Sequence, residues 1–152
     1  MITMKILVGY DGSESSLRAV GKAHRLIKDC GVHEVTLIHA HKQDSRESIS
    51  KDKFATSPDL LDQLKDQDKK NWLEKQEVLE EIAEKLEKSG AKTNIRIEQG
   101  HPAKVIITEA ENGDYDMVIL GRRGRGGLKN MVMGSVSNAV IQGTDTSVLV
   151  VH

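Results

Sequence analysis

Cysteine, proline and aromatic residues are all scarce in this sequence of 152 residues. The single cysteine, Cys30, excludes an intrachain disulfide and therefore a secreted scaffold built on disulfides. The 2 prolines argue against a fibrous or disordered chain. One Trp, two Tyr and one Phe are too few for the stacking platforms of modules that bind single-stranded nucleic acid.

Long hydrophobic runs and an excess of one charge are also missing. The first apolar run, Ile6-Leu7-Val8, is much shorter than the core of a signal peptide or a membrane span. A formal net charge of -1 gives no broad basic surface for DNA or for anionic membranes. We therefore expect a cytoplasmic protein that binds no nucleic acid and does not insert into a membrane.

Apolar strand patterns and helical patterns alternate along the whole chain. Strands are predicted at 5–9, 34–40, 94–98, 116–121 and 147–151. Helices are predicted to begin at Ser13 or Ser15, at Ser57-Pro58-Asp59, at Gly100-His101-Pro102 and at Gly134-Ser135. In the second helix the apolar face lapses over 65–71, which indicates a break or an exposed turn. The alternation predicts one domain, residues 1–152, with an open α/β sheet and helices on both faces.

Strand 94–98 alternates apolar and polar side chains, so we expect it to have one face in water and to lie near the sheet edge. The charged residues of 44–90, 9 basic and 13 acidic, are typical of a solvated helical face.

Ligands of open α/β sheets bind beyond the carboxyl ends of the strands, which selects three places in this chain. They are Gly9-Tyr10-Asp11, His39-Ala40-His41 and the loop that begins at Gly121. That loop combines glycines with arginines and ends at a predicted helix start, Gly134-Ser135. Backbone amides of glycine-rich loops and of helix N-termini bind anions, so the loop predicts a phosphate site. It matches neither the Walker A motif nor the dinucleotide fingerprint.

Each candidate also has a plainer interpretation. The loop from Gly121 is a mobile polar connection in that case, and Asp11 is a turn residue whose carboxylate bonds its own backbone. Asp11 otherwise binds ribose hydroxyls or an adenine amino group. His39 and His41 have the spacing of a metal pair on one strand face, but no Cys or acidic partner stands at ligand spacing. No nucleophile elbow occurs, so a hydrolase triad is not supported.

The ordered set of motifs resembles the universal stress protein family. Gly121-x2-Gly124-x9-Gly134-Ser135 matches the G-x2-G-x9-G-(S/T) signature of its ATP-binding class. The resemblance continues in Ile6-Leu7-Val8 with Asp11 and Ser13, in 37–40, in Gly100-His101-Pro102, in 116–121 and in 148–151. It implies an adenine nucleotide alpha hydrolase-like fold, a parallel sheet of five strands in the order 3-2-1-4-5, and a homodimer that pairs through 147–151.

The resemblance also implies a site for ATP, with or without Mg²⁺, or for another adenine nucleotide. Its residues would be Gly9, Tyr10, Asp11, Ala40, Leu120, Gly121, Gly124, Arg125, Gly134, Ser135 and Val136. Tyr10 departs from the smaller residue that many relatives carry there, so its ring would crowd the base or stack on it.

The resemblance implies a nucleotide-dependent regulator or sensor of the stress response, with at most slow hydrolysis and an unidentified protein partner. The alternatives are an adenylylating enzyme of the same fold group and a nucleotide-free dimeric interaction module.

Overall fold

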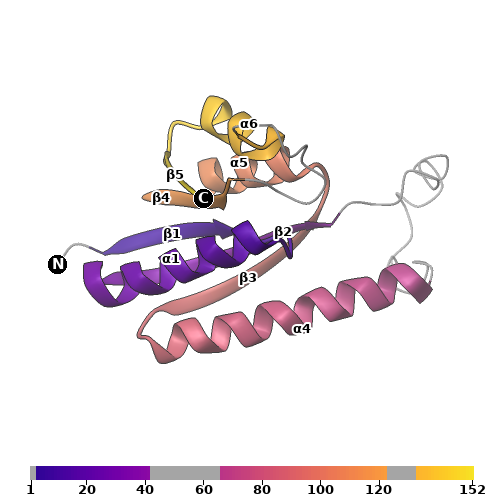
Figure 1. The fold of residues 1–152 in the computed structure, drawn as a ribbon, viewed down its shortest axis with the longest axis horizontal. Coiled ribbons are helices and arrows are strands. Elements are labelled where there is room, and N and C mark those ends of the chain that lie inside the picture. The colour runs from indigo at the N-terminus through magenta and orange to yellow at the C-terminus, as the bar shows by residue number, and fades with distance from the viewer. Residues whose placement is uncertain (1–2, 42–65, 123–132) are drawn as a thin grey trace.

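The computed structural model describes residues 3–41, 66–122 and 133–152 of the chain (Figure 1). The predicted helix start at 57–59 lies outside these residues. The elements are β1 (Met4–Gly9), α1 (Glu14–Cys30), β2 (Val32–His41), α4 (Asp66–Lys88), β3 (Lys92–Gln99), α5 (Pro102–Asn112), β4 (Met117–Gly121), α6 (Ser135–Gly143) and β5 (Ser147–Val151). Helix α4 is continuous through 66–71, so the lapse in its apolar pattern is an exposed turn and not a break within these residues.

The five strands form one parallel sheet in the order β3-β2-β1-β4-β5, which confirms the predicted topology. Strand β1 lies in the middle, where Val8 pairs with Leu37 of β2 on one side and with Ile119 of β4 on the other. Along the chain, β2 and β3 are added to one side of β1, and β4 and β5 are then added to its other side. The strand order therefore reverses between β1 and β4, and such a reversal leaves a crevice at the carboxyl ends of the two strands.

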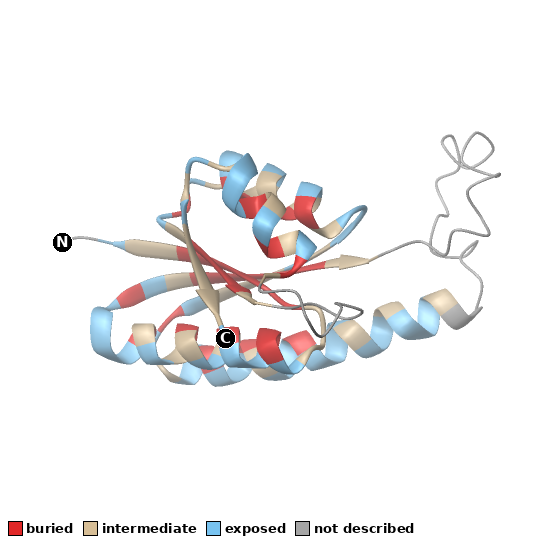
Figure 2. Ribbon diagram, turned by 45° about the horizontal axis from the view of Figure 1, so that its top comes forward, coloured by how far each residue is buried: buried red, intermediate tan, exposed pale blue. Residues whose placement is uncertain are grey.

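Helices cover both faces of the sheet and bury two separate aliphatic cores. Figure 1 shows α1 and α4 on one side and α5 and α6 on the other. Because successive strand residues point to opposite faces, Ile6 and Val8 pack toward α1 and α4, whereas Leu7 packs toward α5 and α6. The buried residues concentrate along the central strands and on the inward helix faces (Figure 2). Strand β3 is at an edge, as its alternation predicts, and none of its residues is buried.

Local signals set the ends of the helices that surround the crevice. Ser13 is the N-cap of α1 and accepts a hydrogen bond from the Ser16 amide at 3.1 Å, while Gly31 ends the helix in the left-handed conformation with φ of 67°. Pro102 stands in the first turn of α5. Helix α6 follows Gly134, which has no side chain to cap it. Among the described residues, no helix is both long enough and apolar enough to cross a membrane.

Candidate functional site

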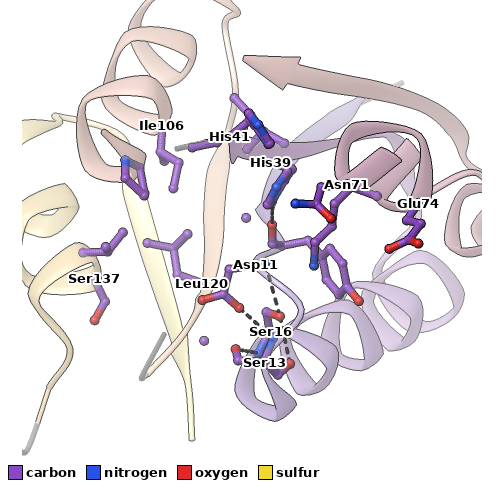
Figure 3. A pocket seen from close by; sticks show the side chains of 18 residues that line it. Asp11, Ser13, Ser16, His39, His41, Asn71, Glu74, Ile106, Leu120 and Ser137 are labelled. Carbon is purple, nitrogen blue, oxygen red and sulfur yellow. Dashed lines mark hydrogen bonds between the residues drawn. The ribbon is translucent and has the colours of Figure 1, made fainter. Parts of the chain in front are cut away.

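A cavity of about 520 Å³ opens at the carboxyl ends of β1, β2 and β4 (Figure 3). Its volume falls within the usual range for sites that bind small molecules. Seven of the predicted site residues line it: Gly9, Tyr10, Asp11, Ala40, Leu120, Gly121 and Val136. Gly134 and Ser135 immediately precede Val136 at the start of α6, outside the lining set. Gly124 and Arg125 lie outside the described residues.

Asp11 is both a turn residue and a wall of the cavity. Its Oδ1 accepts a hydrogen bond from the Ser13 amide at 2.8 Å. This is the bond expected if Asp11 is a turn residue. Its own amide donates to Ser16 Oγ at 3.4 Å. A carboxylate offers about four lone-pair sites, so one turn bond does not exhaust what it can accept. The turn holds the carboxylate in place beside the cavity, as Figure 3 shows.

The glycines that end β1 and β4 permit close packing. A Cβ at Gly9 would lie 2.6 Å from Cδ2 of Leu120. A Cβ at Gly121 would lie 2.6 Å from the carbonyl carbon of Ser15 and 2.8 Å from its oxygen. Strand β4 therefore ends directly against the first turn of α1. The resemblance implies a ligand contact for Gly121, and the structure shows that a glycine there permits this close packing.

Two of the helix N-termini at the cavity, those of α1 and α6, differ in whether a side chain caps them. Ser13 caps α1, so part of the anion-binding capacity of that helix end is already used. Helix α6 has no side-chain cap, and its first intrahelical bond runs from the Asn138 amide to the Gly134 carbonyl at 3.1 Å. The amides of its first turn precede that bond and have no acceptor within the helix. Of these two helix ends, α6 is the one better suited to an anion.

His39 forms part of the cavity floor and is held in one orientation. It is 8% exposed, and its Nδ1 lies 2.9 Å from the Tyr10 carbonyl oxygen. A carbonyl oxygen only accepts, so Nδ1 carries the proton and donates. Burial, the largest influence, lowers the pKa of His39 below its usual 6.5, which favours the neutral ring. The hydrogen bond to Tyr10 acts in the opposite direction.

The Tyr10 ring belongs to the core on the α1 side. Its side chain is 7% exposed and packs with the aliphatic residues beneath the sheet. The Lys75 Nζ lies 5.9 Å from the centre of the ring. The side chain is therefore mostly covered by protein, while Tyr10 also lines the cavity, and the contact between its ring and a base that the resemblance implies stays a prediction. The larger side chain is accommodated in the same core as Ile6 and Val8 of β1.

Residues of α4 line the cavity, and the sequence did not reveal them. Asn71, Glu74 and Lys75 come from the early turns of this helix, and the neighbouring Trp72 ring meets the His41 ring edge to face at 5.4 Å. Most of the charged helix faces solvent as predicted, but Glu74 and Lys75 border the cavity. A helical charge run looks the same in sequence whether it faces water or a ligand. Ser13, Ser16, Pro102, Ile106 and Ser137 also line the cavity and were not predicted as site residues.

Arg122 follows β4 but its guanidinium is directed elsewhere. Its Nη1 lies 3.1 Å from Nδ1 of His152, and Arg122 is not among the lining residues. The cavity wall that the structure describes carries charged side chains at Asp11, Glu74 and Lys75 and apolar ones such as Ile106 and Leu120. Its other polar residues are Ser13, Ser16, His39, His41, Asn71 and Ser137.

A parallel sheet of five strands in the order 3-2-1-4-5, with helices on both faces and a cavity at its switch point, defines a Rossmann-like α/β protein. A model of the Universal stress protein family matches residues 3–152, and the chain belongs to this family.

Relatives cover nearly the whole chain. Universal stress protein YxiE of Bacillus subtilis is 30% identical over 97% of this chain and 98% of that protein. Universal stress protein MJ0577 of Methanocaldococcus jannaschii is 32% identical over 97% of this chain and 93% of that protein. Its solved structure has a TM-score of 0.76 at 31% identity, over 97% of this chain and 94% of that one. UspA from Lactobacillus plantarum shares the fold, with a TM-score of 0.79 at 17% identity over 98% of this chain and 97% of that one.

Proposed function

We propose that this chain binds an adenine nucleotide, ATP in the first place and with or without Mg²⁺, and acts as a nucleotide-dependent regulator or sensor of the stress response. The observation that carries the proposal is the position of one cavity between Asp11, which follows β1, and the N-terminal turn of α6. A carboxylate suits the hydroxyls and amino group of a nucleoside, and an uncapped helix end suits its phosphates.

The nucleoside fits the part of the cavity between Asp11 and the apolar side chains. Leu120 and Ile106 offer apolar contact to a base, and the Ala40 backbone borders the same space. The phosphates of the bound nucleotide would extend from this space toward Ser135 and Val136, whose amides belong to the first turn of α6. In this arrangement Gly124, Arg125 and Gly134 complete the phosphate site, as the family signature implies.

Adenine ligands occur in solved structures of the same fold. One is described as a universal stress protein in complex with cAMP, at 22% identity and a TM-score of 0.66. Another, from Archaeoglobus fulgidus, is described as a complex with dAMP, with the same identity and TM-score. Both ligands contain adenine, which supports an adenine nucleotide for this chain.

A second copy of the chain is the partner that the sheet edges favour. The edge strand β3 carries Lys92, Arg96 and Glu98, and charged side chains discourage edge pairing. The opposite edge, β5, reads Ser-Val-Leu-Val-Val and carries no charge. We therefore propose a homodimer through 147–151.

Calorimetry with ATP, ADP, AMP and GTP, with and without Mg²⁺, tests the nucleotide proposal. Asp11→Asn keeps an oxygen for the Ser13 amide but removes the charge. A hydrogen bond to a charged group contributes about 1.5 to 3 kcal/mol, so the adenine nucleotides should bind roughly 10- to 100-fold more weakly. Asp29→Asn, near the far end of α1, is the matched control. A wild-type chain that binds none of the four nucleotides overturns the proposal.

Product analysis belongs to the same experiment. A regulator returns ATP largely intact, whereas an adenylylating enzyme releases AMP and pyrophosphate over many turnovers. Accumulation of AMP in molar excess over the protein would show an adenylylating enzyme and would contradict the proposed regulator.

A further inference from the structure

We propose that Ser137 is a positioning residue, which fixes the first turn of α6 against the end of β4 so that its amides meet the ligand phosphate. This inference rests on the proposed nucleotide binding. Ser137 is one of the few buried polar residues of the described chain, at 2% exposed, and it lines the cavity from the second half of the first α6 turn (Figure 3).

The Ser137 hydroxyl bonds to backbone oxygens on both sides of the junction between β4 and α6. Its Oγ lies 3.1 Å from the Arg122 carbonyl oxygen and 3.1 Å from the Gly134 carbonyl oxygen. A hydroxyl has one proton, so the two carbonyls share or alternate as its acceptor. Either way, the side chain connects the residue that follows β4 with the residue that precedes α6.

The backbone of the junction is closed by two further bonds. The Gly134 amide donates to the Arg122 carbonyl at 2.8 Å, so that carbonyl receives both an amide and the Ser137 hydroxyl. The Arg122 amide donates to the Val151 carbonyl at 2.7 Å, which connects the junction to β5. Arg122 is thus held from α6 and from β5, and the Ser137 side chain contributes a hydrogen bond to its carbonyl.

These bonds determine which amides remain for an anion. The Gly134 amide already donates within the junction, so the amides of Ser135, Val136 and Ser137 are the ones that lack an acceptor inside the helix. The direction in which these three N–H groups point is set by the orientation of the first turn of α6. At α1 a side chain caps the helix end itself, whereas at α6 the Ser137 side chain bonds behind the helix end and leaves its amides available.

A series of adenosine, AMP, ADP and ATP separates positioning from general structural damage. Ser137→Ala removes the hydroxyl and should weaken ADP and ATP about five- to tenfold, the effect of about one hydrogen bond. Adenosine carries no phosphate and should bind the variant within about twofold of wild type. Ser137→Thr retains a hydroxyl and should restore most of the loss. Ser89→Ala, which removes a hydroxyl bonded to Lys85 at the far end of α4, is the control and should change no affinity.

The outcomes distinguish this inference from the proposed function. If adenosine weakens as much as ATP in Ser137→Ala, or if no member of the series weakens, the positioning role is overturned while nucleotide binding stands. If wild type binds ATP no more tightly than adenosine, the role of the α6 amides is overturned. If wild type binds no member of the series, the proposed function itself fails. Should Ser137→Ala not fold, Ser137→Cys keeps the size with a weaker donor and should show the same phosphate-dependent loss.

Discussion

Gly121 lies so close to Ser15 that no larger residue fits between the end of β4 and the first turn of α1 without displacement. A Cβ at position 121 would be 2.6 Å from the Ser15 carbonyl carbon and 2.8 Å from the carbonyl oxygen. Both atoms belong to the backbone, so a change of rotamer cannot relieve the overlap. The glycine that begins the family signature is therefore required by the fold before any ligand is considered.

We expect Gly121→Ala to lower the free energy of unfolding by about 1 to 3 kcal/mol, the usual range for overpacking. Urea unfolding followed by circular dichroism measures the change. Gly21→Ala is the control, because no heavy atom stands within 4 Å of a Cβ there and the position is inside α1. That variant should be neutral or more stable by about 0.5 to 1 kcal/mol. Equal unfolding midpoints for Gly121→Ala and wild type would contradict the packing argument.

His39 should make the fold less stable in mild acid. Burial lowers the pKa of its ring below 6.5, so the unfolded chain takes up its proton at a higher pH than the native chain does. The stabilisation is complete above pH 6.5 and is lost as the pH falls toward the pKa of the native state. Comparing urea unfolding of wild type and His39→Gln between pH 8 and pH 5 isolates this contribution from that of the other histidines. The variant should show the weaker pH dependence. An NMR titration that places the His39 ring at 6.5 or above would refute the prediction.

Trp72 should report ligand binding by its fluorescence. It is the one tryptophan of the chain and contacts His41, while the adjacent Asn71, Glu74 and Lys75 line the cavity. Adenine nucleotides should change its emission in a saturable way, with the same dissociation constant that calorimetry gives. His41→Ala removes the ring contact and should reduce the change without abolishing binding. A constant emission at a calorimetrically saturating concentration would show that the ligand does not affect this wall.

Val150→Lys should separate the proposed dimer. A lysine on β5 introduces the kind of charge that already protects β3. Among the residues of β5, Val148, Leu149 and Val151 pack against the two cores, and a change at Val150 leaves these contacts in place, so the folded protomer should tolerate it. Sedimentation velocity should give a dimer for wild type and a monomer for the variant. Gln99→Lys, on β3, is the control and should sediment as a dimer, as wild type does. A wild-type monomer at tens of micromolar would rule out this interface.

The sequence predicted those parts of the fold that local chemistry specifies. Apolar runs that stop at glycine, such as the one before Gly9, marked the strands, and Ser13 was one of two candidates for the cap of α1. The proximity of Asp11 and Gly121 followed from the switch-point rule together with the strand order that the resemblance implied.

The missed residues depend on tertiary packing. Lys75 borders the cavity because α4 crosses beside β2, and its helical sequence context does not differ from that of the exposed lysines around it. Ser137 is one of several serines near a helix start, and only its burial and its two carbonyl contacts distinguish it. The sequence predicts which residue types are present, whereas packing decides which of them face the cavity.

The hydrogen bond between the Gly134 amide and the Arg122 carbonyl has a consequence for how this protein family can vary. The bond joins the two ends of the segment 123–132, so β4 and α6 keep their relative position through contacts that lie outside that segment. The relative position of β4 and α6 should therefore tolerate changes of sequence within 123–132, because the contacts that hold it are made by Arg122, Gly134 and Ser137.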